Sequence, residues 1–409
     1  MKILLGITGS IASYKSYDVT RQLVKNGHEV RVILTKGALE FIKPETFRYL
    51  GVEATYQPND DFDPSQISKN ENVLHVELSK WAQKLIIAPA SGNTISRLAT
   101  GITNDLLTSV FLCFVKKPVL IFPAMNTQMW HNERIKEHVL KIQHSTHVGL
   151  IQPTSGLLAC GDIGEGKFPE VNAVVDLIET YDPTLIKNKK VIITAGATAS
   201  PLDPVRFITN PSSGKMGISV AKAFLAQGYE VLLLAGHQCS KDVHHLMGHP
   251  SFRLYQTPTT ELMKKRALEL FPESDLYIST GAIADIEFDP ASIKLKKEAM
   301  GETLSFKKAA DILKEILTLR THQKVVSFAA ETETTKEVFF EKMERKPVDL
   351  MIGNKVSNGL VGGNEVEGFQ KNEGEYFFIE KDSMTGPIGL TKFQLGEKLV
   401  SWFEGQLSW

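Results

Sequence analysis

The sequence predicts an α/β protein with two doubly wound, Rossmann-like domains of three layers each. The chain has 409 residues, more than one ordinary hydrophobic core organises, and 42% of them are hydrophobic, which is enough for two cores. It opens with an apolar strand and a glycine-bearing turn, and residues 191–200 repeat that opening. Each opening leads through a helical stretch to a Gly-x-Glu-Val segment, at residues 27–30 and 228–231.

The domain boundaries follow from the second opening. Residues 182–190 form a short, basic segment between two apolar stretches, which is typical of a linker. We therefore predict a first domain over residues 1–181, a linker over residues 182–190 and a second domain over residues 191–409.

Composition limits the possible functions. The formal net charge is −1, so no overall field attracts nucleic acid or an anionic membrane, and a phosphate ligand must be bound by local groups. No apolar run has the length of a transmembrane segment and none follows Met1 as in a signal peptide, so we expect a cytoplasmic protein. Cys113, Cys160 and Cys239 are too widely spaced for a disulfide framework or a thiolate metal site.

The turn after the first strand, residues 6–12, contains two glycines. Glycine allows a tight turn, and the backbone amides around Gly9, Ser10 and Ile11 could then face an anion. Any strand-to-helix turn in a doubly wound sheet favours glycine, so a purely structural role is the alternative.

The second strand, residues 30–34, ends in Thr35 and Lys36. A dinucleotide site would have an acidic residue here to bind the ribose. Its absence favours a mononucleotide such as FMN.

Three polar residues, Ser91, Asn93 and Thr94, follow the apolar strand at residues 85–88. Open α/β sheets bind ligands at the carboxyl ends of their strands, so these side chains could contact a cofactor. They could equally cap the next helix.

Two unusual loops complete the first domain. Residues 123–130, Pro-Ala-Met-Asn-Thr-Gln-Met-Trp, are too apolar for a solvent loop and too polar for a core, as expected of a pocket wall. Residues 156–167 contain four glycines and Cys160, so they have little core to form and are expected to cover a site as a lid. Cys160 would then face the substrate and could act as an acid, whereas Cys113 lies in an apolar stretch and belongs to the core.

The second domain begins with the strand at residues 191–195. Gly196 and the segment 212–217, Ser-Ser-Gly-Lys-Met-Gly, each suit an anion or a nucleotide. The strand at residues 231–234 again ends without an acidic residue, which argues against a dinucleotide.

Charged residues follow in several places. The histidines and the cysteine between residues 237 and 249 are irregularly spaced, which argues against a metal site. Asp285 follows an apolar strand and supplies a carboxylate at its end. The lysines within residues 294–297 could form one solvated face of a strand or bind phosphate. A plain helix surface is likewise the alternative for Lys342 and Lys346.

Several of these motifs occur together in one known family. Gly-Ser-Ile-Ala at residues 9–12, the isolated His75, the loop 123–130 and Leu-Ala-Cys-Gly at residues 158–161 resemble the flavin-dependent cysteine decarboxylases of coenzyme A biosynthesis. Residues 203–217 add Asp-Pro-Val-Arg-Phe-Ile-x-Asn and Ser-Ser-Gly-Lys-Met-Gly. With them, essentially the whole chain resembles the bacterial bifunctional phosphopantothenoylcysteine decarboxylases and phosphopantothenate-cysteine ligases.

The resemblance implies a decarboxylase chemistry for the first domain. In that family, FMN oxidises the thiol of the substrate to a thioaldehyde, carbon dioxide leaves because the C=S group accepts the electrons, and reduced flavin returns a hydride. His75 would be a base or an orienter, Asn126 would fix the substrate carboxylate, and Cys160 would donate the proton. The implied cofactor-binding residues are Gly9, Ser10, Ile11, Thr35, Ser91, Asn93, Thr94 and Met125.

For the second domain, the resemblance implies that CTP cytidylylates 4'-phosphopantothenate and that the amine of cysteine displaces CMP, giving phosphopantothenoylcysteine. Asn210 would stabilise the acyl-cytidylate or its collapse, and Lys294 would bind the triphosphate. Mg²⁺ would bridge the phosphates of CTP, with no protein ligand assigned to it. The other implied substrate-binding residues of this domain are Asp285, Lys308, Ala309, Ala310, Asp311, Phe328, Lys342 and Lys346. In the first domain, Lys167 is the implied substrate-binding residue.

Some residues depart from the family pattern. Lys167 stands where arginine is common, which removes the bidentate fork of a guanidinium. Residues 308–311, Lys-Ala-Ala-Asp, replace Asn-Pro-Asp at the implied CTP contact, which leaves the nucleotide preference open. The other departures are Gln83, Gly92, Ala197 and Ser200.

The resemblance also implies a homo-oligomer in which trimeric flavoprotein units are linked by ligase dimers. Two other interpretations compete with it. A flavin-binding regulatory protein that has lost its chemistry is argued against by the presence of all five implied catalytic residues, His75, Asn126, Cys160, Asn210 and Lys294. A nicotinamide dehydrogenase is argued against by the missing acidic residues after both second strands.

Overall fold

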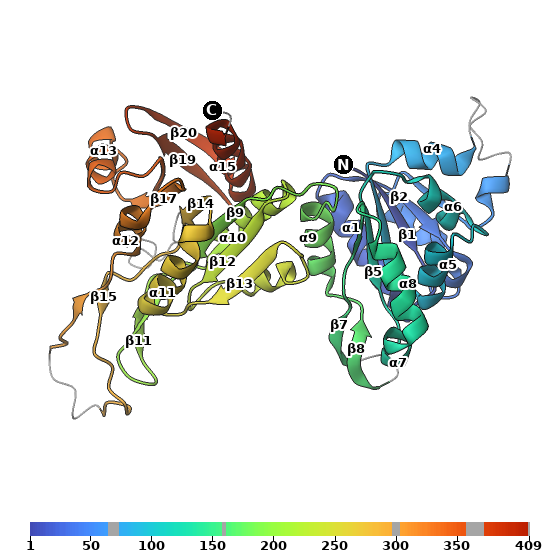
Figure 1. Cartoon of the computed structure of the whole chain (residues 1–409), viewed down its shortest axis with the longest axis horizontal. Helices are drawn as coiled ribbons and strands as arrows, with labels where there is room; N and C mark the ends of the chain where they lie inside the picture. The colour runs from blue at the N-terminus through green and yellow to red at the C-terminus, as the bar shows by residue number, and fades with distance from the viewer. Residues whose placement is uncertain (64–72, 158–160, 297–302, 357–371, 408–409) are drawn as a thin grey trace. The chain divides into compact units, whose positions relative to one another are not determined.

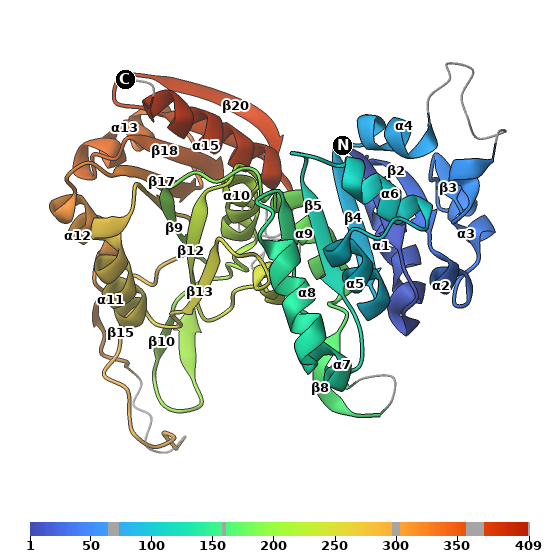
Figure 2. The same cartoon turned by 45° about the vertical axis from the view of Figure 1, so that its right-hand side comes forward.

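The computed structural model describes residues 1–63, 73–157, 161–296, 303–356 and 372–407. The chain forms two compact units, Met1–Ile186 and Lys187–Trp409, and the border between them falls inside the segment 182–190 (Figure 1). Each unit has a largely parallel sheet with helices on both faces, as Figures 1 and 2 show. The predicted fold class is confirmed.

The first unit contains a six-stranded sheet, a separate hairpin and short helices. The sheet strands are β1 (Lys2–Ile7), β2 (Glu29–Leu34), β3 (Ala54–Tyr56), β4 (Lys84–Ala90), β5 (Val119–Pro123) and β6 (Val148–Leu150), and the hairpin is β7 (Thr154–Leu157) with β8 (Ile163–Lys167). The α-helices are α1 (Ser16–Lys25), α2 (Lys36–Leu39), α3 (Pro44–Tyr49), α4 (Leu74–Trp81), α5 (Gly92–Thr100), α6 (Leu106–Cys113), α7 (Thr127–His131), α8 (Glu133–Gln143) and α9 (Val171–Thr180). Two 3-10 helices are η1 (Ile11–Lys15) and η2 (Asp60–Phe62).

The strand order in this sheet is β3-β2-β1-β4-β5-β6, and every neighbouring pair is parallel. Alternate residues of a strand point to opposite faces, so Leu5 joins one hydrophobic core with α1 and α9, and Leu4 joins another with α4, α5 and α6. The chain order reverses beside β1, and ligands of doubly wound sheets bind at the carboxyl ends of the strands at such a point.

Lys84 is a buried cation that caps a helix of the first unit. Its Nζ donates to the carbonyl oxygens of Ile178 (2.8 Å) and Tyr181 (2.9 Å) at the end of α9. Burial lowers the pKa of its ammonium from 10.5 to about 8, although the carboxylates of Asp182 and Glu179 raise it. The folded chain therefore loses this proton at a lower pH than the unfolded chain does.

We expect the wild type to gain stability over Lys84→Met as the pH rises from 7.5 to 9.5. In that window the unfolded state binds a proton that the folded state has released, so the unfolding free energy of the wild type rises by about 2 kcal/mol. Methionine has no such proton and leaves two buried carbonyl groups without their donor, which costs roughly 1–3 kcal/mol each. Urea titrations with pulse proteolysis of the first unit at both pH values measure the difference. Parallel pH dependences of the two proteins would contradict the expectation.

The second unit contains an eight-stranded sheet and two small hairpins. The sheet strands are β9 (Lys190–Ala195), β12 (Glu230–Ala235), β13 (Phe252–Gln256), β14 (Leu276–Ser279), β17 (Lys324–Glu331), β18 (Leu350–Lys355), β19 (Glu373–Ile379) and β20 (Met384–Thr391). The hairpins are β10 (Ala199–Pro201) with β11 (Phe207–Thr209) and β15 (Ile286–Glu287) with β16 (Lys307–Lys308). The helices are α10 (Lys215–Ala226), η4 (Lys241–Leu246), α11 (Thr260–Leu270), η5 (Phe271–Glu273), α12 (Ile312–Leu319), α13 (Lys336–Arg345) and α15 (Lys392–Leu407).

The strand order in this second sheet is β13-β12-β9-β14-β17-β18-β19-β20, and the strands from β13 to β18 are parallel. β19 is antiparallel to both β18 and β20, so β20 again points in the direction of β18. The carboxyl end of β20 therefore lies at the same edge of the sheet as the other carboxyl ends. Lys392, which directly follows β20, is brought to that edge, and α15 then packs along α10, where a Cβ on Gly396 would lie 2.8 Å from Ala223.

Within the described ranges of the chain, we find no helix with the length and apolar character needed to cross a membrane.

Candidate active sites in the two units

A cavity of about 610 Å³ lies at the carboxyl ends of β1, β4 and β5, beside the point where the strand order reverses. This volume is typical of a small-molecule or cofactor site. Its walls come from the turn after β1, the start of α5, the loop before α7 and the hairpin β7–β8. The lining residues are Gly9, Ser10, Ile11, Ala12, Tyr14, Lys15, Ser91, Gly92, Ala124, Met125, Asn126, Met129, Leu157, Gly166, Lys167 and Phe168.

Most of the residues predicted for this site meet in the cavity. Those that line it are Gly9, Ser10, Ile11, Ser91, Met125, Asn126 and Lys167. Three predicted cofactor residues, Thr35, Asn93 and Thr94, are not among its lining residues. Ser91 has both of the roles considered from the sequence, because it lines the cavity and its Oγ also accepts the Thr94 N–H (3.3 Å) at the start of α5.

Short-range contacts fix the floor of the cavity. A Cβ on Gly9 would lie 2.9 Å from the Cα of Gly37, so only glycine allows these two backbones to approach so closely. The Ser10 hydroxyl donates to the Ala124 carbonyl (3.1 Å) and thereby links the turn after β1 to the loop after β5. Asn126 begins α7, and its Oδ1 accepts the Gln128 N–H (2.8 Å), which orients the amide.

The hairpin β7–β8 is attached to the loop that contains Met125 and Asn126. The Met125 N–H donates to the Gly166 carbonyl (3.1 Å), and the Thr127 hydroxyl donates to the Glu165 carbonyl (2.7 Å). Gly166 has φ +127°, and a Cβ there would lie 2.2 Å from the Met125 carbonyl oxygen. The described part of the predicted lid therefore forms one wall of the cavity. Cys160, the predicted proton donor, lies outside the described residues.

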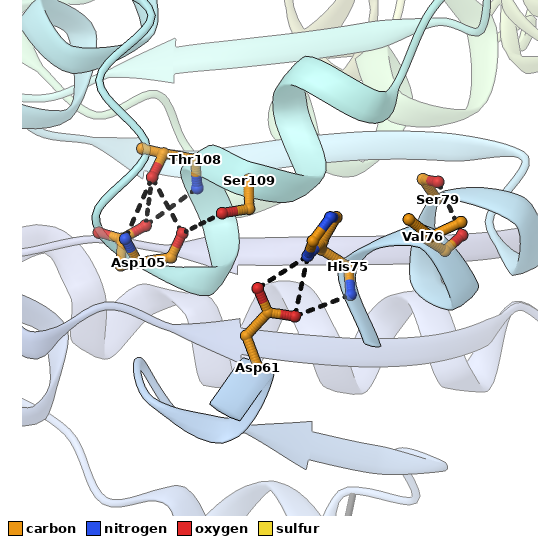
Figure 3. A network of polar contacts seen from close by, with 7 residues as sticks. All are labelled: Asp61, His75, Val76, Ser79, Asp105, Thr108 and Ser109. Atoms are coloured by element: carbon orange, nitrogen blue, oxygen red, sulfur yellow. Dashed lines mark hydrogen bonds and ion pairs between the residues drawn. The ribbon is translucent and has the colours of Figure 1, made fainter. Parts of the chain in front are cut away.

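His75 does not line this cavity in the single chain. It lies in the first turn of α4, where its Nδ1 is within 2.7 and 2.9 Å of the two carboxylate oxygens of Asp61 (Figure 3). The backbone N–H of His75 donates to the same carboxylate (3.1 Å). The sequence singled out His75 but gave no sign of its partner, because the two residues are separated by 14 positions and belong to different helices.

The second unit has three adjoining cavities, of about 350, 450 and 630 Å³, at the carboxyl edge of its sheet. Phe328 lines all three of them, so they form one continuous candidate site. We call them the first, second and third ligase cavities. The predicted residues that line them are Asn210, Asp285, Lys308, Ala309, Ala310, Asp311, Phe328, Lys342 and Lys346.

The first ligase cavity is cationic. Lys215 and Lys392 line it together with Asn210 and Asn354, and no lining residue described there is acidic. Burial and, to a smaller extent, the nearby charge of Lys215 lower the pKa of the Lys392 ammonium to about 8. Two ammonium groups that line one cavity favour an anionic ligand.

Two lysines of the other two cavities, Lys342 and Lys346, have carboxylate partners. Lys342 forms an ion pair with Glu331, and Lys346 forms one with Asp311 (2.7 Å). Burial raises the pKa of the Asp311 carboxyl, but hydrogen bonds from Lys346 and from the Lys314 backbone outweigh it, so this pKa is lowered. A phosphate that binds here would have to share or replace these partners.

Asn210 lines the first ligase cavity, whereas Lys294 lies outside the three cavities. The Asn210 amide donates to the carbonyl oxygens of Ala282 (3.4 Å) and Ile283 (3.3 Å), at the border of the first and third ligase cavities. Lys294 is exposed and is not among the lining residues of these cavities. Its neighbour Leu295 is held by Arg206, whose Nη2 donates to the Leu295 carbonyl (2.6 Å).

The prediction that Cys113 belongs to the core is wrong, because its side chain is exposed at the last residue of α6. Sequence reasoning also missed several lining residues. Lys215 lies inside a motif that the sequence singled out, yet its ammonium was given no role. Lys392 lies in a segment with no local signal, because strand pairing far along the chain brings it to the cavity. Among the described residues, no group of three or more His, Cys, Asp or Glu side chains could hold a metal ion.

Two family models match the chain: Flavoprotein over residues 1–181, and DNA/pantothenate metabolism flavoprotein C-terminal domain over residues 186–405. The chain is 36% identical to the Coenzyme A biosynthesis bifunctional protein CoaBC of Bacillus subtilis over 368 residues, which cover 87% of this chain and 86% of that protein. It is also 36% identical to the protein of that name from Haemophilus influenzae, with 90% and 91% covered.

Among solved structures, a PPC decarboxylase mutant complexed with pantothenoylaminoethenethiol is 33% identical, with a TM-score of 0.40, and the match covers 43% of this chain and 95% of that one. The two family models together span both units, and the curated relatives are similar over most of the chain. The chain therefore belongs to the family of the coenzyme A biosynthesis bifunctional proteins CoaBC.

Proposed function

We propose that this chain catalyses two steps of coenzyme A biosynthesis. The second unit joins cysteine to 4'-phosphopantothenate, and the first unit decarboxylates the product, phosphopantothenoylcysteine, to 4'-phosphopantetheine. The observation that carries this proposal is that most of the residues predicted for each unit line cavities at the carboxyl edges of two separate sheets. Family membership over the whole chain supports it.

The cavity of the first unit suits FMN. It has the volume of a cofactor site, and Gly92 leaves room in it, because a Cβ there would press on Met129 at 3.2 Å. Ser10, Lys15 and Asn126 supply polar groups at its rim. When bound, FMN supplies the reversible oxidation of a thiol and thereby makes decarboxylation possible.

The chain's own groups then bind and protonate the substrate. The Asn126 Oδ1 accepts the Gln128 N–H, which fixes the orientation of the amide. The Nδ2 group is the donor of an amide, and it would donate to the substrate carboxylate. Lys167 adds a positive charge on the hairpin, and Cys160 supplies the proton in the last step.

His75 lies outside the cavity of its own chain, which supports a homo-oligomer in which another copy completes the site. We propose flavoprotein trimers linked by ligase dimers.

In the second unit, CTP activates the carboxyl group because a free carboxylate does not accept an amine. The second and third ligase cavities bind CTP, with Lys342 and Lys346 exchanging their carboxylate partners for phosphate. Mg²⁺ would be held by the phosphates of CTP and would neutralise part of their charge. The first ligase cavity, with Lys215 and Lys392, holds the phosphate of 4'-phosphopantothenate. Asn210 lines the first ligase cavity, and its amide exchanges one of its long hydrogen bonds, to the carbonyl of Ala282 or Ile283, for one to the charge that develops on the acyl group. Lys294 closes on the triphosphate from its exposed loop.

One experiment tests both steps. The purified full chain is supplied with FMN, Mg²⁺, CTP, cysteine and 4'-phosphopantothenate, and CMP and carbon dioxide are measured together. We expect a yellow protein that releases both products in equal amounts. A colourless protein that releases neither pyrophosphate nor carbon dioxide, even when phosphopantothenoylcysteine is added directly, would refute the proposal.

A further inference from the structure

We infer that Asp61 is a positioning residue for His75 and fixes it as a proton acceptor that acts through Nε2. The inference rests on the proposed decarboxylase function, and it resolves the two roles that the sequence left open for His75. It concerns how the imidazole is oriented and which of its nitrogens carries the proton.

The geometry singles out the Nδ1 edge of the imidazole. Both carboxylate oxygens of Asp61 lie within hydrogen-bond distance of Nδ1, at 2.7 and 2.9 Å, and Figure 3 shows the carboxylate pointing at that edge. One of these oxygens also accepts the His75 backbone N–H at 3.1 Å. A single carboxylate thus fixes both the backbone and the ring of His75.

The burial of the two side chains differs in a way that suits this arrangement. The Asp61 side chain is 7% exposed, whereas the His75 side chain is 26% exposed. Removing a carboxylate from water is costly unless hydrogen bonds replace the lost solvation, and His75 supplies them. The exposed part of His75 remains accessible to a ligand. A helix cap alone would require only the backbone contact and would not explain the contacts of both oxygens with the ring.

The proton position follows from hydrogen-bond chemistry. An ionised carboxylate only accepts, so Nδ1 carries the proton in the neutral imidazole. Nε2 then has the lone pair and is the nitrogen that can take a proton from a substrate. The same logic, in which a carboxylate on one imidazole nitrogen sets the tautomer and leaves the other as a base, applies in serine proteases.

Asp61→Asn tests the inference with Asp60→Asn as its matched control. Asparagine keeps an oxygen for the His75 backbone N–H, but its amide can also donate to Nδ1 and so allows the wrong tautomer. We expect kcat for carbon dioxide release from phosphopantothenoylcysteine to fall about 100-fold or more in the FMN-loaded full chain, with KM changed less than about threefold. Asp60→Asn removes the same charge one residue away, and its kcat should equal that of the wild type. Both variants should also contain as much flavin as the wild type.

A double-mutant cycle separates positioning from a structural effect. If Asp61 acts only through His75, adding Asp61→Asn to His75→Gln should not lower kcat further. If the double variant loses kcat by the product of the two single losses, the inference is overturned. An Asp61→Asn protein with wild-type kcat would overturn it as well.

The tautomer can also be measured without turnover. Solid-state ¹⁵N spectra of histidine-labelled protein, with His75 identified by its loss in His75→Gln, should show a protonated Nδ1 in the wild type and a mixture in Asp61→Asn. A wild-type His75 protonated at Nε2 would overturn the inference. A wild type that releases no carbon dioxide would refute the proposed function instead, and the ¹⁵N spectra would still decide the role of Asp61.

Discussion

Asn210→Asp lowers the ligase turnover of the full chain by about 100- to 1000-fold, the range found when one donor to a developing oxyanion is removed. The wild-type amide donates to the carbonyl oxygens of Ala282 and Ile283 (3.4 and 3.3 Å) beside the cationic first ligase cavity. A carboxylate cannot donate and is repelled by these two oxygens. In the proposed reaction it would also add a negative charge next to the phosphates of CTP and of the acid substrate. Rapid-quench measurements of pyrophosphate and CMP record the effect.

The pattern of the two products locates the step at which Asn210 acts. If it stabilises the collapse of the acyl-cytidylate, the variant should release about one pyrophosphate per site and accumulate acyl-cytidylate, with little CMP. Asn188→Asp makes the same substitution at an exposed position of the second unit and should retain wild-type turnover. Carbon dioxide release from added phosphopantothenoylcysteine should be unchanged in both variants. CMP formation by Asn210→Asp at the wild-type rate would rule out the assigned role.

Local sequence signals predicted the architecture of both units because parallel strands buried on two faces are apolar at almost every position. The strands β1 and β9 are such runs, and the glycines after them mark the turns at the carboxyl edge. The residues of these turns and loops could therefore be assigned to sites before any contact was known. Ser10 and Asn126 are examples, since each follows directly after a strand in a doubly wound fold.

Contacts between distant segments could not be predicted in this way. Lys392 reaches the first ligase cavity because β19 is antiparallel and β20 restores the strand direction, and nothing near Lys392 in the sequence signals that pairing. The sequence likewise predicted Lys342 and Lys346 as phosphate-binding groups, but it did not indicate that each is already paired with a carboxylate. The contact of His75 with Asp61 could not be predicted either, because Asp61 lies in a different helix.

The hairpin β7–β8 gives the second large effect, because Gly166 is a position at which a side chain meets both strain and a collision. Its φ of +127° is unfavourable for any residue with a Cβ, which costs roughly 1–3 kcal/mol. A Cβ would also lie 2.2 Å from the Met125 carbonyl oxygen, so the hairpin must move away and lose the hydrogen bond from the Met125 N–H. The wall of the cavity beside Asn126 would then open.

We therefore expect Gly166→Ala to raise the Kd for FMN by about 100-fold, which corresponds to about 3 kcal/mol of strain and lost contact. Gly161→Ala is the matched control, because Gly161 belongs to the same glycine-rich segment and has φ +90°, but a Cβ there would lie within 4 Å of none of the atoms that the structure describes around it. It carries backbone strain without the collision, so its Kd should rise less than about tenfold. Fluorescence titration of the deflavinated full chains measures both values, and ligase turnover reports that the second unit is intact. The two variants share the backbone strain and differ in the collision with the Met125 loop. Equal Kd values for FMN would therefore mean that strain alone accounts for the lost affinity, and that contact between the hairpin and this loop does not hold the flavin.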